Sequence, residues 1–134
     1  MPYADSNFFL ALLKKSDWLN PNAEKLLKKH KNNIWTSGWT IIEIFMLSEK
    51  FGLDPESVVT SIKEMARIEG GSSLLLSVAY LMKEKYMNTF DALHAISCGK
   101  DRIISSDGKF DEIGLKRIKL EENLDSENEN ISKK

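Results

Sequence analysis

Residues 34–47, with the sequence IWTSGWTIIEIFML, contain the features from which we infer the fold. Residues 34–36 form a short strand-like run, and a strongly apolar helix follows Gly38. Glu43 lies in this helix among residues that are apolar on almost every side, so we expect the helix to be largely buried. A buried carboxylate is normally paired, metal-bound or neutralised. Because no nearby residue of the helix offers a cation, we expect Glu43 to have a partner from elsewhere.

The sequence before this stretch predicts a short strand and two helices. The strand is Pro2-Tyr3-Ala4, which leads into Asp5. Apolar residues then recur at helical spacing at positions 8, 9, 12 and 13. Asn20-Pro21 opens a second helix, since proline suits the first helical position, with Leu26 and Leu27 on its buried face.

The sequence after this stretch predicts three helices and then two strands. Phe51-Gly52-Leu53 ends the apolar helix. The later elements are a helix capped at Asp54 and running to Met65, a break at Gly70-Gly71, a helix over 73–86, a helix from Asn88 to Gly99 that bears Asp91, a strand at Ile103-Ile104, a turn at 106–108 and a last strand at Ile118.

Alternating strands and helices predict an α/β fold with a mostly parallel sheet flanked by helices. The consecutive helices at 53–98 are unusual for a plain doubly wound fold. We expect one domain over residues 1–120 and an acidic tail over 121–134, disordered after Glu122, because few apolar residues occur there.

From the cysteine content and the apolar runs we expect a protein of a reducing compartment without a membrane anchor. The single Cys98 cannot form an internal disulfide. No apolar run approaches the roughly 18 residues of a membrane helix, and the first residues do not resemble a signal peptide. We therefore expect a cytoplasmic protein.

Four carboxylates, Asp5, Glu43, Asp91 and Asp107, lie at or near predicted strand–helix junctions or helix starts. Such junctions can converge at one end of a parallel sheet. Two like charges about 4 Å apart repel by roughly 4 kcal/mol at an effective dielectric near 20. We therefore expect a fold that gathers four of them to hold a divalent cation, which is the pattern of a metal-dependent nuclease.

Three of these acids also have purely structural interpretations. Asp5 can cap a helix, Asp107 lies in a Ser-Asp-Gly turn, and Asp91 follows Asn88 at the spacing of a capping box. The two histidines and Cys98 lack the spacing of a zinc site, and no phosphate-binding glycine loop occurs. The carboxylate, amide and hydroxyl oxygens favour Mg²⁺ or Mn²⁺.

Charge is distributed unevenly along the chain. The tail carries a net charge of −3, which leaves residues 1–120 at +2, against −1 for the whole chain. A basic cluster precedes the strand-like run and could follow the phosphates of a nucleic acid, although a solvated helix face explains it equally well. Its members are Lys14, Lys15, Lys25, Lys28, Lys29 and Lys31.

Four segments together resemble the motifs of PIN-domain ribonucleases, and in particular the small single-domain group that includes VapC-type toxins. They occur in the family's order, within residues 2–120, although the first strand is shorter than usual. These segments are Ala4-Asp5-Ser6-Asn7, Thr36-Ser37 with Glu43, Thr89-Phe90-Asp91-Ala92-Leu93-His94-Ala95, and Ile104-Ser105-Ser106-Asp107-Gly108-Lys109-Phe110-Asp111.

This resemblance implies a Rossmann-like three-layer α/β/α sandwich with an inserted helical clip, and Mg²⁺- or Mn²⁺-dependent cleavage of RNA. The acidic quartet would be Asp5, Glu43, Asp91 and Asp107, with Asp111 auxiliary or in place of Asp107. The supporting polar residues would be Ser6, Asn7 and Ser105. A toxin of this group would bind an antitoxin peptide and form a homodimer.

Three alternatives remain open from the sequence. The same site would serve maturation of ribosomal or transfer RNA. A catalytically idle PIN-like module would bind RNA or protein without metal. A phospho-acceptor receiver domain also gathers acids at strand ends, but it requires a paired acid near the N-terminus, and Asp5 stands alone.

Overall fold

The computed structural model describes residues 1–14 and 16–122. They form two compact units. The first comprises residues 1–96, and the second begins at residue 97 and is described as far as residue 122. Most of the predicted tail, 123–134, and Lys15 of the basic cluster lie outside the described residues. Within the described ranges, no helix is long and apolar enough to cross a membrane.

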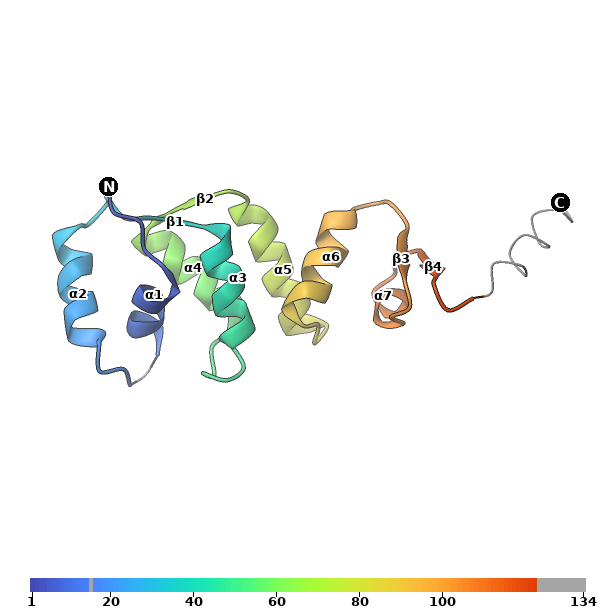
Figure 1. Cartoon of the computed structure of the whole chain (residues 1–134), viewed down its shortest axis with the longest axis horizontal. Coiled ribbons are helices and arrows are strands. Elements are labelled where there is room, and N and C mark those ends of the chain that lie inside the picture. Colours follow the sequence, from blue (N-terminus) through green and yellow to red (C-terminus); the bar gives the residue numbers. More distant parts are fainter. Residues whose placement is uncertain (15, 123–134) are drawn as a thin grey trace, which may run out of the picture. The chain divides into compact units, whose positions relative to one another are not determined.

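The helices of the first unit largely follow the predictions from local signals (Figure 1). Asp54 caps α4 by accepting a hydrogen bond from the Ser57 backbone N–H, as its position before Pro55 predicts. Gly70 and Gly71 both adopt positive φ where the chain breaks before α5. The helices are α1 (Ser6–Leu13), α2 (Asn20–Lys29), α3 (Gly38–Leu47), α4 (Pro55–Met65), α5 (Ser72–Glu84) and α6 (Thr89–Cys98), the last of which ends in the second unit.

Two helix predictions were wrong in detail. We expected the apolar helix to end at Phe51-Gly52-Leu53, whereas α3 ends at Leu47. Leu26 was predicted to lie on the buried face of α2, but 46% of it is exposed, and Ala23 is the buried residue of that helix. The error at Leu26 concerns tertiary packing, which the spacing of apolar residues does not specify.

The strands of the first unit are parallel. β1 (Trp35–Ser37) pairs with β2 (Arg67–Glu69), with Ser37 opposite Glu69. Tyr3 forms a further parallel bridge to Trp35, so the predicted first strand is present as a single bridge. The sequence did not predict β2. This strand divides the predicted helical insertion, because the chain returns to pair with β1 between α4 and α5, which pack against each other.

The core of the first unit lies where α1, α3, α4 and α5 meet. Its largest fully buried side chains come from these helices and β1: Phe9, Phe45, Ile41, Ile44, Ile62, Val58, Val59, Val78 and Thr36. Each large side chain contributes about 1.5–3 kcal/mol by leaving water. This packing fixes α1 and α3, which carry Asp5 at the cap of α1 and Glu43 within α3.

The second unit contains β3 (Ile103–Ser105), α7 (Lys109–Glu112) and β4 (Arg117–Lys119). β3 and β4 are parallel, and Phe110 of α7 is buried. The mixed α/β class and the parallel pairing agree with the predictions. The described strands form two separate parallel pairs, so the single central sheet of a three-layer sandwich stays a prediction.

Candidate functional site at the carboxyl edge of the first unit

The ends of two neighbouring strands bring separate sequence motifs to one edge of the first unit. The Ala4 backbone N–H donates to the Trp35 carbonyl at 2.9 Å, and the Trp35 N–H donates to the Pro2 carbonyl at 3.1 Å. Because the two segments are parallel, Asp5 and Ser37 leave them at the same end. We call this end, with Asp5, Ser6, Ser37 and Glu43, the carboxyl edge.

Asp5 is exposed and caps α1. Its extended backbone precedes the helix, and its carboxylate accepts a hydrogen bond from the Asn7 backbone N–H at 3.1 Å. The capping interpretation of Asp5 is therefore confirmed. A cap occupies one acceptor position of a carboxylate that has about four, so the same side chain keeps acceptor capacity for a cation.

A direct hydrogen bond joins the first two sequence motifs. The Ser6 hydroxyl donates to Glu43 Oε1, although the two residues are 37 positions apart in the sequence. Ser6 is buried beside the cap of α1. A hydroxyl donor restrains the Glu43 carboxylate without neutralising its charge.

The expectation that Glu43 is buried was wrong. Its side chain is exposed, because the buried face of α3 is narrower than the apolar sequence suggested. Ile41, Ile44 and Phe45 are buried, whereas Trp39 is 78% exposed and Met46 is 57% exposed. The partner of Glu43 comes from another element, as predicted, but it is an uncharged serine.

Tyr3 belongs to the carboxyl edge and was missed by the sequence interpretation. Its hydroxyl lies 2.8 Å from Ser37 Oγ and 3.3 Å from Thr40 Oγ1. These hydroxyls lower the pKa of Tyr3, Ser37 most strongly, while the negative charge of Asp5 opposes them. The available signal was strand alternation, which places Tyr3 and Asp5 on the same face.

Thr36 fixes the strand that leads to Asp5. Its side chain is completely buried, and its hydroxyl donates to the Ala4 carbonyl at 2.7 Å. This bond satisfies a carbonyl one residue before Asp5, and it explains why a threonine occupies the buried position of β1.

Asp91 is half-buried in the first turn of α6. Its backbone N–H donates to the Asn88 side-chain carbonyl at 2.8 Å, so Asn88 caps this helix as the spacing suggested. Over residues 1–14 and 16–122, no group of three or more Asp, Glu, His or Cys side chains lies close enough together to hold a metal ion.

Asp107 and Asp111 have different environments in the second unit. Asp107 closes its own turn, accepting from the Lys109 N–H at 2.9 Å and donating its N–H to Ser105 Oγ at 3.0 Å. Asp111 instead accepts from the Arg117 guanidinium, at 3.0 Å from Nε and 2.9 Å from Nη2. This pairing lowers the pKa of Asp111 and makes its carboxylate a poorer candidate for a metal ligand.

Arg117 is the centre of a polar network that the sequence did not reveal. Its side chain is only 4% exposed, and it also donates to the Ser105 carbonyl at 2.7 Å and to Glu121 Oε1 at 2.9 Å. Glu121, which we assigned to the acidic tail, therefore forms an ion pair with Arg117 of β4.

The basic cluster divides into engaged and exposed lysines. Lys14 pairs with Asp17 at 3.1 Å and lies 4.3 Å from the centre of the Phe51 ring. Lys25, Lys28 and Lys29 are exposed on α2, and Lys31 is exposed just after it.

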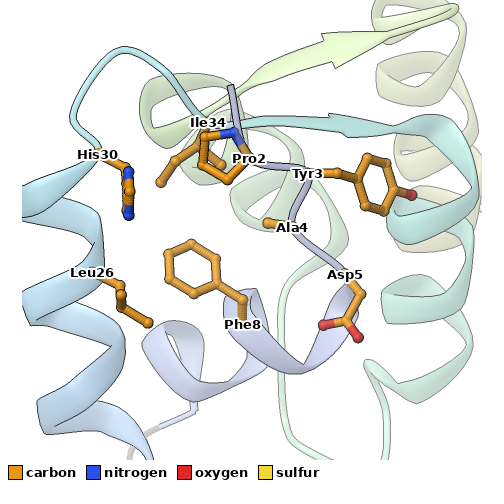
Figure 2. Close-up of a pocket in the computed structure, with 8 residues that line it drawn as sticks. All are labelled: Pro2, Tyr3, Ala4, Asp5, Phe8, Leu26, His30 and Ile34. Carbon is orange, nitrogen blue, oxygen red and sulfur yellow. The ribbon is translucent and has the colours of Figure 1, made fainter.

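A pocket of about 440 Å³ opens beside Asp5, between the first residues of the chain and α2 (Figure 2). Phe8, Leu26 and His30 converge in it, while the Asp5 carboxylate lies on the side away from α2. The Tyr3 ring points away from the pocket toward α3, where its hydroxyl meets Ser37.

The donors at these positions fit a hard divalent cation in their chemistry. In the described part of the chain, none of the four carboxylates Asp5, Glu43, Asp91 and Asp107 forms a salt bridge with a lysine or arginine. Oxygen atoms of this kind suit Mg²⁺ and Mn²⁺. Comparisons with protein-family models, with curated proteins and with solved structures found no match to the chain.

Proposed function

We propose that this protein is a divalent-metal-dependent endoribonuclease with a PIN-like three-layer α/β/α fold. The observation that carries the proposal is the hydrogen bond from Ser6 to Glu43, which joins two distant motifs beside Asp5. Carboxylates held by uncharged donors keep their negative charge. The available negative charge at the end of parallel strands supports cation binding there.

Within the first unit, the residues that would hold Mg²⁺ or Mn²⁺ are Asp5, Glu43 and Asp91. Asp107 is proposed as the fourth acid on the resemblance of its motif alone. A bound ion would lower the pKa of a water molecule and stabilise charge on the scissile phosphate. Ser6 would hold the Glu43 carboxylate in one orientation, and Asn7 and Ser105 would support the chain beside Asp5 and Asp107. The exposed lysines of α2 would attract the RNA backbone.

A cytoplasmic toxin of a toxin–antitoxin pair is the biological role that we favour, on the resemblance of its motifs to VapC-type proteins. An antitoxin peptide would then bind at the acidic site, and the chain would form a homodimer. A role in maturation of ribosomal or transfer RNA would use the same chemistry.

The test compares two aspartates that have the same structural role. Asp5 and Asp54 both cap a helix of the first unit through a backbone N–H, and asparagine preserves that capping. We expect Asp5→Asn to lower the Mn²⁺-dependent cleavage rate of a labelled single-stranded RNA by about 100-fold or more, because it removes a charged ligand. Asp54→Asn should cleave at the native rate.

Native-rate cleavage by Asp5→Asn would contradict the assignment. Isothermal titration with Mn²⁺ distinguishes the alternative of an idle module, which would bind RNA without binding the ion. Urea unfolding of both variants checks that loss of the charge, rather than loss of the fold, causes the effect.

A further inference from the structure

The pocket beside Asp5 is lined mainly by apolar side chains, with the His30 imidazole among them. Phe8 and Leu26 face each other across it, and the His30 imidazole points toward the Phe8 ring (Figure 2). Leu26 is 46% exposed, which is unusual for a leucine in the middle of an amphipathic helix. An aromatic face next to an imidazole can bind a flat ring with polar edges, because the ring stacks on one group and exchanges a hydrogen bond with the other.

Two exposed lysines of α2 are close in sequence to the pocket residue Leu26. Leu26 lies in α2 and His30 caps the end of that helix four residues later, where its backbone N–H donates to the Leu26 carbonyl. Lys25 and Lys29 are also four residues apart, and both are exposed. A ligand that fits would therefore have an apolar, flat part for the pocket and an anionic part for the lysines. A nucleotide has this combination of properties.

We propose that the pocket binds one unpaired base of the RNA substrate, that of the nucleotide next to the cleaved phosphate. The position follows from Asp5, which both lines the pocket and belongs to the carboxyl edge. The volume of about 440 Å³ lies in the range of small-molecule sites, roughly 300–1,000 Å³. This inference rests on the proposed function, since it names a part of the same substrate.

The experiment measures RNA binding in EDTA, so that cleavage does not interfere. A short fluorescent single-stranded RNA is compared with a series in which one nucleotide at a time lacks its base. Leu26→Asp places a carboxylate in the pocket. Leu74→Asp is the matched control, because Leu74 is 40% exposed in the same unit but lines a different groove. Both variants change the net charge equally.

We expect one abasic position to weaken binding to the native protein by about tenfold. Leu26→Asp should bind the intact RNA about tenfold more weakly than Leu74→Asp, and the abasic series should show no sensitive position in Leu26→Asp. The base then no longer contributes, since its site is blocked.

An abasic series without a sensitive position in the native protein, or equal affinities of the two variants, would overturn the proposal. If Mn²⁺-dependent cleavage persists in that case, the pocket assignment alone fails. If the native protein neither binds nor cleaves RNA, the proposed function fails with it. Unchanged RNA affinity together with loss of self-association in Leu26→Asp, measured by sedimentation, would assign the pocket to a second copy of the chain.

Discussion

Two pairs of carboxylates, one pair in each unit, are held in opposite ways. In the first unit, Asp5 and Glu43 accept hydrogen bonds from a backbone amide and a serine hydroxyl. In the second unit, Asp111 and Glu121 share the guanidinium of Arg117. Uncharged donors orient a carboxylate without balancing its negative charge, whereas a guanidinium balances that charge. Arg117 donates twice to Asp111 Oδ2 and contacts both oxygens of Glu121.

This difference indicates which acids are available for a cation. The pKa values of Asp111 and Glu121 are lowered chiefly by their hydrogen bonds to Arg117. A metal ion at Asp111 would compete for Oδ2 with Arg117, a side chain that is 4% exposed and bound to three partners. Asp107 stands in the same unit with only amide and hydroxyl contacts, and it therefore resembles Asp5 more than it resembles Asp111.

The largest effect expected from this comparison separates Asp107 from Asp111 as the fourth acid. We expect Asp107→Asn to lower Mn²⁺-dependent RNA cleavage by about 100-fold, because an amide cannot replace a charged ligand. Asp111→Asn should retain near-native cleavage, since its carboxylate already serves Arg117. Single-turnover kinetics of both variants measure the difference. The reverse order of rates would make Asp111 the ligand.

A second, smaller effect concerns the orientation of Glu43. Ser6→Ala removes its hydroxyl donor, and losing such a supporting contact typically costs about 10-fold in metal affinity or activity. Ser57→Ala is the matched control, because the Ser57 hydroxyl donates in the same way to Asp54 at 2.8 Å. Mn²⁺ titration should show weaker binding in Ser6→Ala alone. Equal affinities would show that the bond to Glu43 has no part in binding the ion.

The sequence predicted well the features that depend on neighbours in the chain. Asp54 and Asn88 cap α4 and α6 at the predicted positions, because a capping side chain reaches only two or three residues along the backbone. Capping was one of the two roles considered for Asp5, and the structure shows that it does cap α1. The parallel arrangement of the strands also followed from the alternation of elements.

Features that depend on distant partners were missed. β2 contains one apolar residue, Ile68, and it exists because β1 is available to pair with it. The apolar run of α3 could not reveal that Trp39 is exposed, since burial is decided by which helices pack against it. Arg117 meets Asp111 across a turn, and no helical or strand periodicity relates those two positions.

The pairing in the second unit also predicts a dependence of stability on pH. Arg117 holds the folded-state pKa of Asp111 below its ordinary value of 3.8. Stability from this pair is therefore present above that value and is lost as the pH falls through the folded-state pKa. We expect Arg117→Met to weaken the protection of β3 and β4 amides from hydrogen exchange at neutral pH.

When the pH is lowered to about 3, the β3 and β4 amides of Arg117→Met should lose less additional protection from hydrogen exchange than those of the native protein. Arg67→Met is the control, because Arg67 pairs with Glu69 in the first unit and both side chains are more than half exposed. An acid response of β3 and β4 that is unchanged by Arg117→Met would show that other groups cause it.

The smallest expected effect comes from comparing a lysine that is already paired with one that is exposed. Lys14 is already paired with Asp17 and lies over the Phe51 ring, whereas Lys29 is exposed on α2. For single-stranded RNA, each phosphate contact contributes about 0.7 to the slope of log affinity against log salt. Lys29→Gln should therefore reduce the slope in EDTA by about 0.7, and Lys14→Gln should leave it unchanged. Equal slopes for the two variants would mean that exposure on α2 does not select the lysines that bind RNA, because an engaged and an exposed lysine would then contribute alike.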